Sequence, residues 1–103
     1  MFWSKPVPKG YMISAHRSPA DPEKAAAYRE FAKPALEAAG GKFLAGGGQV
    51  VAKENGVAER TILIEFESFE AAVAAYESDA YQEALRALDG GANRDIRLFE
   101  GLE

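Results

Sequence analysis

His16 is the only histidine in this 103-residue chain, and histidine is the side chain whose ordinary pKa lies nearest neutrality. It ends a short segment with strand character. Antiparallel pairing would bring that end near the start of the last predicted strand, where Asp95 and Arg97 lie. An imidazole oriented by Asp95 could transfer a proton, so His16 is a candidate catalytic residue. The alternative is a histidine at a strand end or interface that makes a hydrogen bond without chemistry.

Glu65 lies inside the apolar run 60–66, where a carboxylate needs a charged or hydrogen-bonding partner. Two roles fit this position. Glu65 could be a general base inside a cavity, and it is therefore the second candidate catalytic residue. It could instead form an ion pair with Arg97 or Arg60 across the sheet or across a dimer interface.

Aromatic residues supply the remaining candidates for ligand binding. The four tyrosines occupy helix or strand positions that we expect to be half-buried. An aromatic cluster can line a pocket for a small hydrophobic molecule, although core packing with the hydroxyls reaching water explains the same positions. The candidate binding residues are Tyr11, Arg97, Tyr76 and Tyr81, and Tyr28 belongs to the same cluster.

Several kinds of chemistry are disfavoured by composition. The chain has no cysteine, which excludes disulfides, thiolate nucleophiles and cysteine-based metal sites. A single histidine argues against an ordinary zinc or copper site. The glycines at 46–48 lack the Lys-Ser/Thr pair of a phosphate-binding loop and instead favour a turn or bulge. We therefore expect no metal and no tightly bound cofactor.

Two helical regions must position these residues. Asp21-Pro22-Glu23 is a typical helix start, with Asp as the N-cap and Pro at the first helical position. The apolar stripe that follows has helical spacing and ends at Gly40-Gly41. Its members are Tyr28, Phe31, Ala32, Ala35, Leu36 and Ala39. Ser68 caps a second helix, and Ser78-Asp79 begins a further turn or short helix.

Four strand regions alternate with these helices. The strand regions are Tyr11–Arg17, Lys42–Ala45 with Gln49–Lys53, Arg60–Phe66 and Asp95–Leu102. The second region fits one strand interrupted by a glycine bulge or two short strands, and Glu54-Asn55-Gly56 predicts a tight turn. The order β-α-β-β-α-β predicts an α+β, ferredoxin-like fold: a four-stranded antiparallel sheet with helices on one face.

Length and charge limit the possible partners. We expect one domain over residues 10–103, preceded by an extended leader over residues 1–9, where two prolines oppose regular structure. The net charge of -4, with dispersed basic residues, argues against nucleic-acid binding. No apolar run is long enough to span a membrane. The cytoplasm is the default expectation for localisation.

The face of the sheet away from the helices predicts a homodimer. We assign Tyr11, Ile13 and Ala15 to the helix-facing side, and Met12, Leu63 and Phe99 to the open side, together with charged residues. Leaving such apolar side chains in water forgoes about 25 cal/mol for each Å² not buried. A second copy of the same face would cover them by two-fold symmetry.

The chain resembles domain-of-unknown-function family 1330, within the dimeric α/β-barrel superfamily. The matching segments lie at 9–11, 21–23, 40–45, 60–66, 68–72, 76–82 and 100–101, so the resemblance spans residues 9–102. It implies a ferredoxin-like fold whose sheets pair into a dimeric α/β-barrel, and it implies no particular reaction. The family pattern usually has an arginine where Gly46 stands and aromatics where Met12 and Ala75 stand.

Two functions from different classes are compatible with these observations. The first is a small homodimer that binds or converts a small aromatic, quinone or carboxylic molecule without a tightly bound cofactor; superfamily relatives include monooxygenases, isomerases and dehydratases. The second is a non-catalytic binding or structural module in which His16, Glu65 and Arg97 serve the interface. The first predicts that these residues meet at a solvent-accessible cavity; the second predicts that they pair within the interface.

Overall fold

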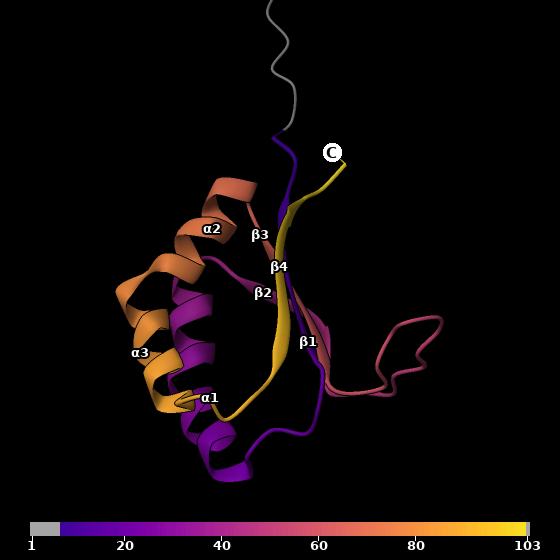
Figure 1. Ribbon diagram of the computed structural model, residues 1–103. Helices are drawn as coiled ribbons and strands as arrows, with labels where there is room; N and C mark the ends of the chain where they lie inside the picture. The colour runs from indigo at the N-terminus through magenta and orange to yellow at the C-terminus, as the bar shows by residue number, and fades with distance from the viewer. Residues whose placement is uncertain (1–6, 103) are drawn as a thin grey trace, which may run out of the picture.

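Two layers, a sheet and a set of helices, make up the computed structural model, which describes residues 7–102 (Figure 1). The elements are β1 (Gly10–His16), α1 (Pro22–Ala38), β2 (Lys42–Gly46), β3 (Thr61–Phe66), α2 (Phe69–Glu77), α3 (Asp79–Leu88) and β4 (Arg94–Glu100). All helices lie on the same side of the sheet. The predicted α+β class and the helical coverage of one face are confirmed.

The sheet has the strand order β2-β3-β1-β4, and every neighbouring pair is antiparallel. The first two strands of the chain are therefore separated by β3, as in a split β-α-β arrangement. β1 and β3 are central, whereas β2 and β4 are edges. Because β1 pairs with both β3 and β4, its residues hold the register of the whole sheet.

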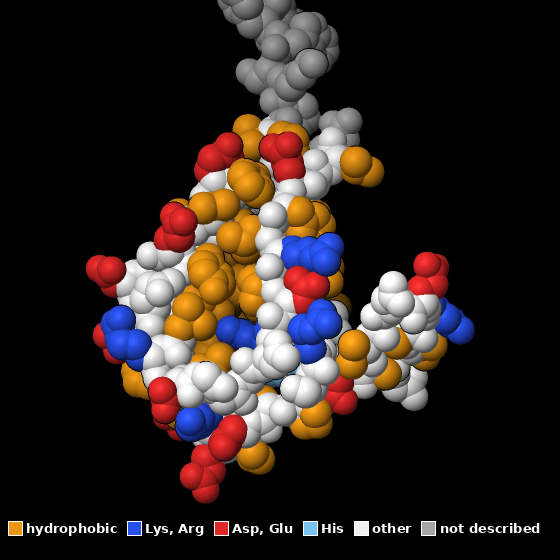
Figure 2. Space-filling view, viewed as in Figure 1, with side chains coloured by type: hydrophobic (Ala, Val, Ile, Leu, Met, Phe, Trp, Pro, Cys, Tyr) orange, Lys and Arg blue, Asp and Glu red, His pale blue; other side chains and the backbone are white. Residues whose placement is uncertain are grey.

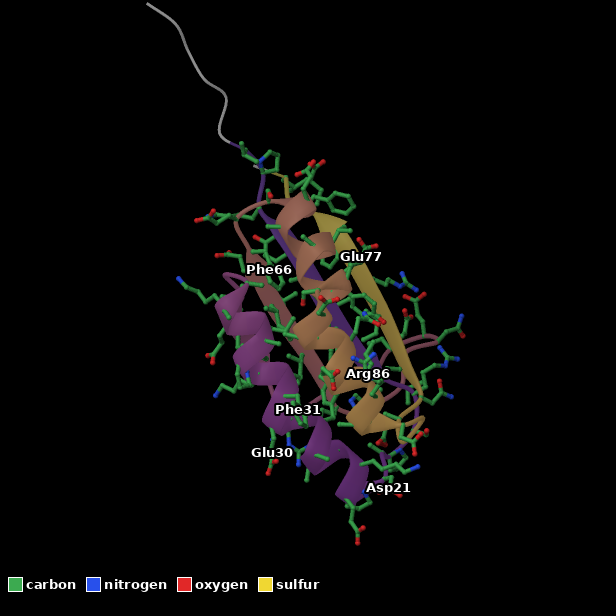
Figure 3. The ribbon with its side chains drawn as sticks, turned by 90° about the vertical axis from the view of Figure 1, so that its left-hand side faces the viewer. Asp21, Glu30, Phe31, Phe66, Glu77 and Arg86 are labelled. Atoms are coloured by element: carbon green, nitrogen blue, oxygen red, sulfur yellow. The ribbon has the colours of Figure 1, made fainter. Side chains whose placement is uncertain are left out.

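The helices begin where the sequence predicts. Asp21 accepts a hydrogen bond from the Lys24 backbone N–H at 3.0 Å, and Pro22 is the first residue of α1. Gly40 then adopts a φ of +91°, which only glycine takes without strain, and the chain turns toward β2. Figure 3 looks onto the helical layer, with Asp21 at the start of α1 and Arg86 on α3.

One serine joins the last two helices. The backbone N–H of Ser78 bonds to the Ala75 carbonyl at 3.3 Å, which ends α2. Its hydroxyl oxygen accepts from the Tyr81 backbone N–H at 3.2 Å, which starts α3. Ser78 is therefore the cap of both helices, and no other residue lies between them.

The core lies between the two layers. Tyr81, Phe66 and Met12 are its largest fully buried side chains, and alanines from all three helices fill much of the rest. Figure 2 shows hydrophobic side chains gathered in the seam between the helical layer and β4. Gly10 is required at the start of β1, since a Cβ there would lie 2.1 Å from the Ser68 carbonyl oxygen.

The connection between β2 and β3 differs from the prediction. Gln49–Lys53 is not a strand; it belongs to an irregular loop, 47–60, that projects on the side of the sheet away from the helices (Figure 1). The tight turn is present at its tip, where the Gly56 N–H bonds to the Lys53 carbonyl at 2.8 Å. Gly46 is the last residue of β2, and Gly47 and Gly48 begin the loop instead of forming a bulge within a longer strand; the register of β2 is irregular earlier, between Phe43 and Ala45.

The assignment of faces within β1 is also corrected. Met12 and Ser14 are buried toward the helices, whereas Tyr11 and Ile13 lie on the open face. The alternation predicted the reverse, because Tyr11, Ile13 and Ala15 are the more apolar set. Polar Ser14 and His16 are accommodated on the helix side because a cavity lies there.

Two further expectations concern the ends and the surroundings of the chain. The leader predicted at residues 1–9 falls mostly outside the described range, and residues 7–9 have no regular secondary structure. In the part of the chain that the structure describes, no helix combines the length and apolar character needed to cross a membrane.

Candidate functional site

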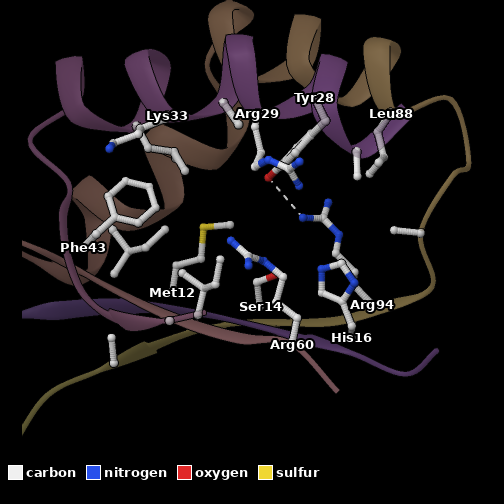
Figure 4. A pocket seen from close by; sticks show the side chains of 18 of the residues that line it. Met12, Ser14, His16, Tyr28, Arg29, Lys33, Phe43, Arg60, Leu88 and Arg94 are labelled. Atoms are coloured by element: carbon white, nitrogen blue, oxygen red, sulfur yellow. Dashed lines mark hydrogen bonds between the residues drawn. The ribbon is translucent and has the colours of Figure 1, made fainter. Parts of the chain in front are cut away.

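A cavity of about 500 Å³ lies between α1 and the helix-facing side of the sheet (Figure 4). Its apolar lining includes Met12, Leu36, Phe43, Ile62, Ile64 and Leu88. The space exists because α1 presents small side chains there: Ala25 and Ala32 face the cavity and cannot fill it. The edge strand β2 closes the cavity only partly, and Phe43 remains 37% exposed.

Polar groups are concentrated at one end of the cavity. Figure 4 shows His16 and Arg94 together at this end, and Phe43 and Lys33 at the other. His16 and Arg94 are paired residues of β1 and β4, which places their side chains side by side on the same face. Tyr28 reaches down from α1, and Arg94 Nη1 donates a hydrogen bond to its hydroxyl at 3.0 Å.

Tyr28 is also bonded to the buried Tyr81, with 2.7 Å between the two hydroxyl oxygens. Tyr81 is fully buried, and Tyr28 is its hydroxyl's hydrogen-bond partner. Either hydroxyl could be the donor in this bond, but an unpaired buried donor is costly, so we infer that the Tyr81 O–H donates to Tyr28. In this arrangement the Tyr28 oxygen accepts from Tyr81 and from Arg94, and its own proton is free to point into the cavity.

The pKa values of these groups are shifted by their surroundings. Burial, reinforced by neighbouring Tyr28, raises the pKa of the Tyr81 phenol far above its usual value, so it stays protonated. Burial lowers the pKa of His16, and the positive charges of Arg94 and Arg60 lower it further, with Glu59 opposing them. His16 is therefore neutral at pH 7 and can accept a proton.

Arg94 remains charged although it is half-buried. Burial lowers the pKa of its guanidinium, but the hydroxyls of Tyr28 and Tyr81 more than offset this effect, and the net pKa is raised. The guanidinium carbon also lies 4.8 Å from the centre of the Tyr28 ring, a cation–π distance. The polar end of the cavity thus combines a fixed positive charge with a neutral imidazole and a phenol.

The six residues predicted as site residues lie in three different places. His16 lines the cavity. Tyr76 and Tyr81 belong to the core and contact each other, with ring centres 5.0 Å apart, and neither lines the cavity. Tyr11, Glu65 and Arg97 lie on the open face, where Tyr11 pairs with Glu65. The predicted residues therefore do not converge on one site.

The predicted meeting of His16 with Asp95 or Arg97 is corrected by the strand register. His16 is paired with Arg94, so Asp95 and Arg97 point to the opposite side of the sheet. There they bond to each other, with Arg97 Nε and Nη2 each 3.1 Å from an Asp95 carboxylate oxygen. Among the described residues, Glu65 forms no ion pair, so the predicted pairing with Arg97 or Arg60 is absent within one chain.

Arg94 and Arg60 are the cavity residues that sequence reasoning missed. Arg94 appeared only as one of the dispersed basic residues and Arg60 only as a possible ion-pair partner of Glu65, because a lone arginine has no spacing pattern that marks it. One signal was available: Ser14 and His16 alternate with apolar residues in β1, which indicates a strand side facing a polar space. In the described part of the chain, no cluster of His, Asp and Glu could hold a metal ion.

The chain matches one family of known proteins. The family model for domain of unknown function DUF1330 matches residues 9–102. A comparison with curated proteins gives no match. A solved protein of unknown function from Rhodopseudomonas palustris is similar, with 20% identity, a TM-score of 0.69, and coverage of 93% of this chain and 84% of that chain.

Two named oxygenases are also similar in structure. A putative antibiotic biosynthesis monooxygenase from Nitrosomonas europaea has 15% identity and a TM-score of 0.53, covering 98% of this chain and 96% of that chain. SnoaB, a cofactor-independent oxygenase from Streptomyces nogalater, has 11% identity and a TM-score of 0.52, covering 94% of this chain and 95% of that chain. Identities this low show a shared fold.

Proposed function

Since the chain belongs to the DUF1330 family, a domain of unknown function, we propose its function from its own cavity: it is a small homodimer that binds a small organic molecule between α1 and the sheet. The observation that carries this proposal is the cavity of about 500 Å³, apolar along most of its wall and polar at one end. Ligand sites typically have this size and combine an apolar lining with a few convergent polar groups.

The open face of the sheet supports the homodimer. Tyr11 and Phe99 stack there with ring centres 5.6 Å apart, and Ile13 lies opposite Leu63. Phe99 is 42% exposed in the single chain. The loop 47–60 projects on this same side, where it could extend along a partner (Figure 1). A second copy of this face would bury all of these groups by two-fold symmetry.

The alternative function, a non-catalytic binding or structural module, fits only two of the three residues assigned to its interface. It placed His16, Glu65 and Arg97 together in an interface, yet His16 lies on the cavity side while Glu65 and Arg97 lie on the open side. An interface role remains compatible with Glu65 and Arg97. His16 is available for the cavity.

Conversion of the ligand is a second candidate function, and the neutral His16 favours it. A neutral imidazole can remove a proton from a C–H or O–H group of the ligand, and the adjacent Arg94 would stabilise the resulting negative charge. The structural similarity to a cofactor-independent oxygenase is compatible with such chemistry. Exchange of ligand protons for deuterium in D₂O, present with the wild type and lost in His16→Gln, would support this role.

A matched pair of variants tests binding in the cavity. The wild type is screened by thermal shift against small aromatic, quinone and carboxylic compounds. Ala32→Leu places a larger side chain in the cavity, whereas Ala26→Leu makes the same change at an exposed position of α1. We expect compounds that stabilise the wild type and Ala26→Leu but not Ala32→Leu. No stabilising compound, or equal stabilisation of all three proteins, would contradict the proposal.

A further inference from the structure

We propose that this cavity binds an amphipathic carboxylate: Arg94 and Tyr28 hold the carboxylate group, and the apolar body of the molecule lies along Met12, Leu36 and Phe43. This inference rests on the proposed function, because it names the class of small molecule that the cavity takes. It depends on three observations, which are the charges of the cavity, the free donors of Arg94 and the separation of polar and apolar ends, and on the inferred direction of the Tyr28–Tyr81 hydrogen bond.

The cavity is positively charged in an acidic protein. The chain has 16 acidic and 12 basic residues, yet the described residues that line the cavity include four cations and no Asp or Glu. The four are Arg29, Lys33, Arg60 and Arg94. None of them forms an ion pair among residues 7–102; the pairs there involve Lys24, Arg86 and Arg97. The cavity therefore attracts anions.

Arg94 is the cation best placed to bind a ligand. A guanidinium has five N–H donors in a planar fork, and within the described chain one of them is bonded, to Tyr28. The remaining donors face a half-buried space without a counter-charge. Two parallel N–H groups match the two oxygens of a carboxylate, which is the geometry that arginine binds most specifically.

Tyr28 supplies a further donor at the same point. With the Tyr81 O–H as donor, its oxygen accepts hydrogen bonds from Arg94 and from Tyr81, which leaves its own O–H to donate into the cavity. A phenol that donates beside a guanidinium fits an oxyanion and does not fit a cationic ligand. The buried Tyr81 holds this hydroxyl in place through the 2.7 Å hydrogen bond between the two phenols.

The apolar part of the ligand lies away from Arg94. Figure 4 shows Met12 near the middle of the cavity and Phe43 at the end opposite Arg94. Leu36 and Ile64 line the same region. Lys33 and Arg29 are exposed on α1 and form the rim of the cavity, where they would attract an anion before it binds.

A partner subunit does not explain the unpaired charge of Arg94. The proposed dimer uses the open face of the sheet, whereas Arg94 points to the helix-facing side. Asp95, its neighbour in β4, points to the open face and is bonded to Arg97. In that dimer Arg94 still has no carboxylate partner within residues 7–102, which leaves its guanidinium available to a ligand in the cavity.

The test compares two probes of nearly the same size and shape, 2-naphthoate and 2-naphthamide; the amide is neutral and has an NH₂ donor in place of one carboxylate oxygen. Isothermal titration calorimetry measures both dissociation constants with the wild-type protein. We expect 2-naphthoate to bind about tenfold to a hundredfold more tightly, the range that charge-assisted hydrogen bonds provide. This comparison needs no variant, so a folding defect cannot affect it. Equal affinities for the two probes would overturn the carboxylate proposal.

Variants then assign the preference to a residue. In Arg94→Gln we expect the affinity ratio of the two probes to fall to near one, and Arg94→Lys should recover part of it. Arg86→Gln is the matched control, since Arg86 is exposed on α3 and paired with Glu83, outside the cavity. Circular dichroism confirms folding. An unchanged ratio in folded Arg94→Gln would overturn the assignment to Arg94.

The two proposals fail in different ways. If both probes bind the wild type equally and Ala32→Leu blocks both, the cavity binds small molecules but does not select carboxylates, and only the present inference is overturned. If neither probe binds and the wider screen yields no compound, the proposed function itself is overturned.

Discussion

The two faces of the sheet carry the same kinds of residue in opposite arrangements. On the helix-facing side, Arg94 lies at the end of a cavity that no described Asp or Glu lines, and it forms no ion pair within the described chain. On the open side, Arg97, three residues later in β4, is bonded to Asp95 at 3.1 Å. The charge of Arg97 is balanced by Asp95, whereas the half-buried Arg94 has no ion-pair partner among the described residues. The comparison supports the two proposals made above, ligand binding on the helix-facing side and dimer assembly on the open side.

Leu63→Glu is expected to have the largest effect, because it places a charge in the middle of the open face, opposite Ile13. We expect the homodimer to dissociate completely, since an unpaired charge cannot be buried against a second copy. Light scattering after size-exclusion chromatography should show the mass of one 11.1 kDa chain instead of twice that mass.

Phe31→Glu is the control for this variant. Phe31 is 49% exposed on α1, in the helical layer, and its replacement should leave the mass unchanged. A wild type that is already monomeric at micromolar concentration would contradict the proposal that the open face serves dimer assembly.

Loss of the tyrosine pair tests the cavity side. Tyr28→Phe leaves the Tyr81 hydroxyl buried without its partner, which should lower the free energy of unfolding by about 1–3 kcal/mol. Tyr81→Phe should cost less, about 1 kcal/mol, because Tyr28 keeps Arg94 and the open cavity as partners. Urea unfolding measures both values. The reverse order would contradict the assigned direction of the hydrogen bond.

His16 offers a smaller, pH-dependent test. Its pKa in the folded protein lies below the ordinary value of 6.5, so between these two values the unfolded chain binds the proton more readily. Stability should therefore fall as the pH decreases through this window, and His16→Gln should remove that dependence. Arg94, Arg60 and Glu59 are the charged groups that act on His16.

The same histidine also reports on the ligand. Because the chain has one histidine, its ring proton gives a single NMR titration curve. A carboxylate bound beside Arg94 should raise the pKa of His16, and the anion should accordingly bind more tightly as the pH falls through that range. A pKa that does not move with saturating 2-naphthoate would place the carboxylate elsewhere.

Val51→Ser should give the smallest effect. Val51 is 77% exposed in the loop 47–60, which projects on the open side of the sheet. If this loop contacts a partner, losing the apolar side chain should raise the dimer dissociation constant by roughly fivefold, corresponding to about 1 kcal/mol. Sedimentation equilibrium measures the change, and Ala26→Ser on α1 is the control. No change would leave the sheet face alone as the interface.

Most of the fold follows from local signals in the sequence. Asp21 and Ser68 cap helices as predicted, because a short polar side chain before an apolar stripe has one favourable local arrangement. The run of β-branched residues in β3 forms a strand as predicted, because such side chains favour extended backbone. The loop that contains Gln49–Lys53 was not predicted, since its valines have strand propensity but find no neighbouring strand to pair with.

The candidate site was less predictable, and the reason lies in β1. Alternation assigned the apolar Tyr11 and Ile13 to the core, yet the structure buries Met12 and Ser14 instead. The alternation rule assumes that the face covered by the helices contacts only apolar side chains. Here the covered face of β1 borders the polar end of a cavity, and the open face carries apolar Tyr11 and Ile13, so the rule fails where the molecule departs from a simple core.

Ser78 has a consequence for the distant cavity. It joins α2 to α3 without a spare residue, and Tyr81 follows three residues later. One residue inserted at this junction would rotate α3 by about 100° about its own axis. The Tyr81 hydroxyl would then turn away from Tyr28, and the phenol that is bonded to Arg94 would lose its hydrogen bond to Tyr81. The chemistry of the cavity thus depends on the length of a helix junction as well as on the side chains that line it.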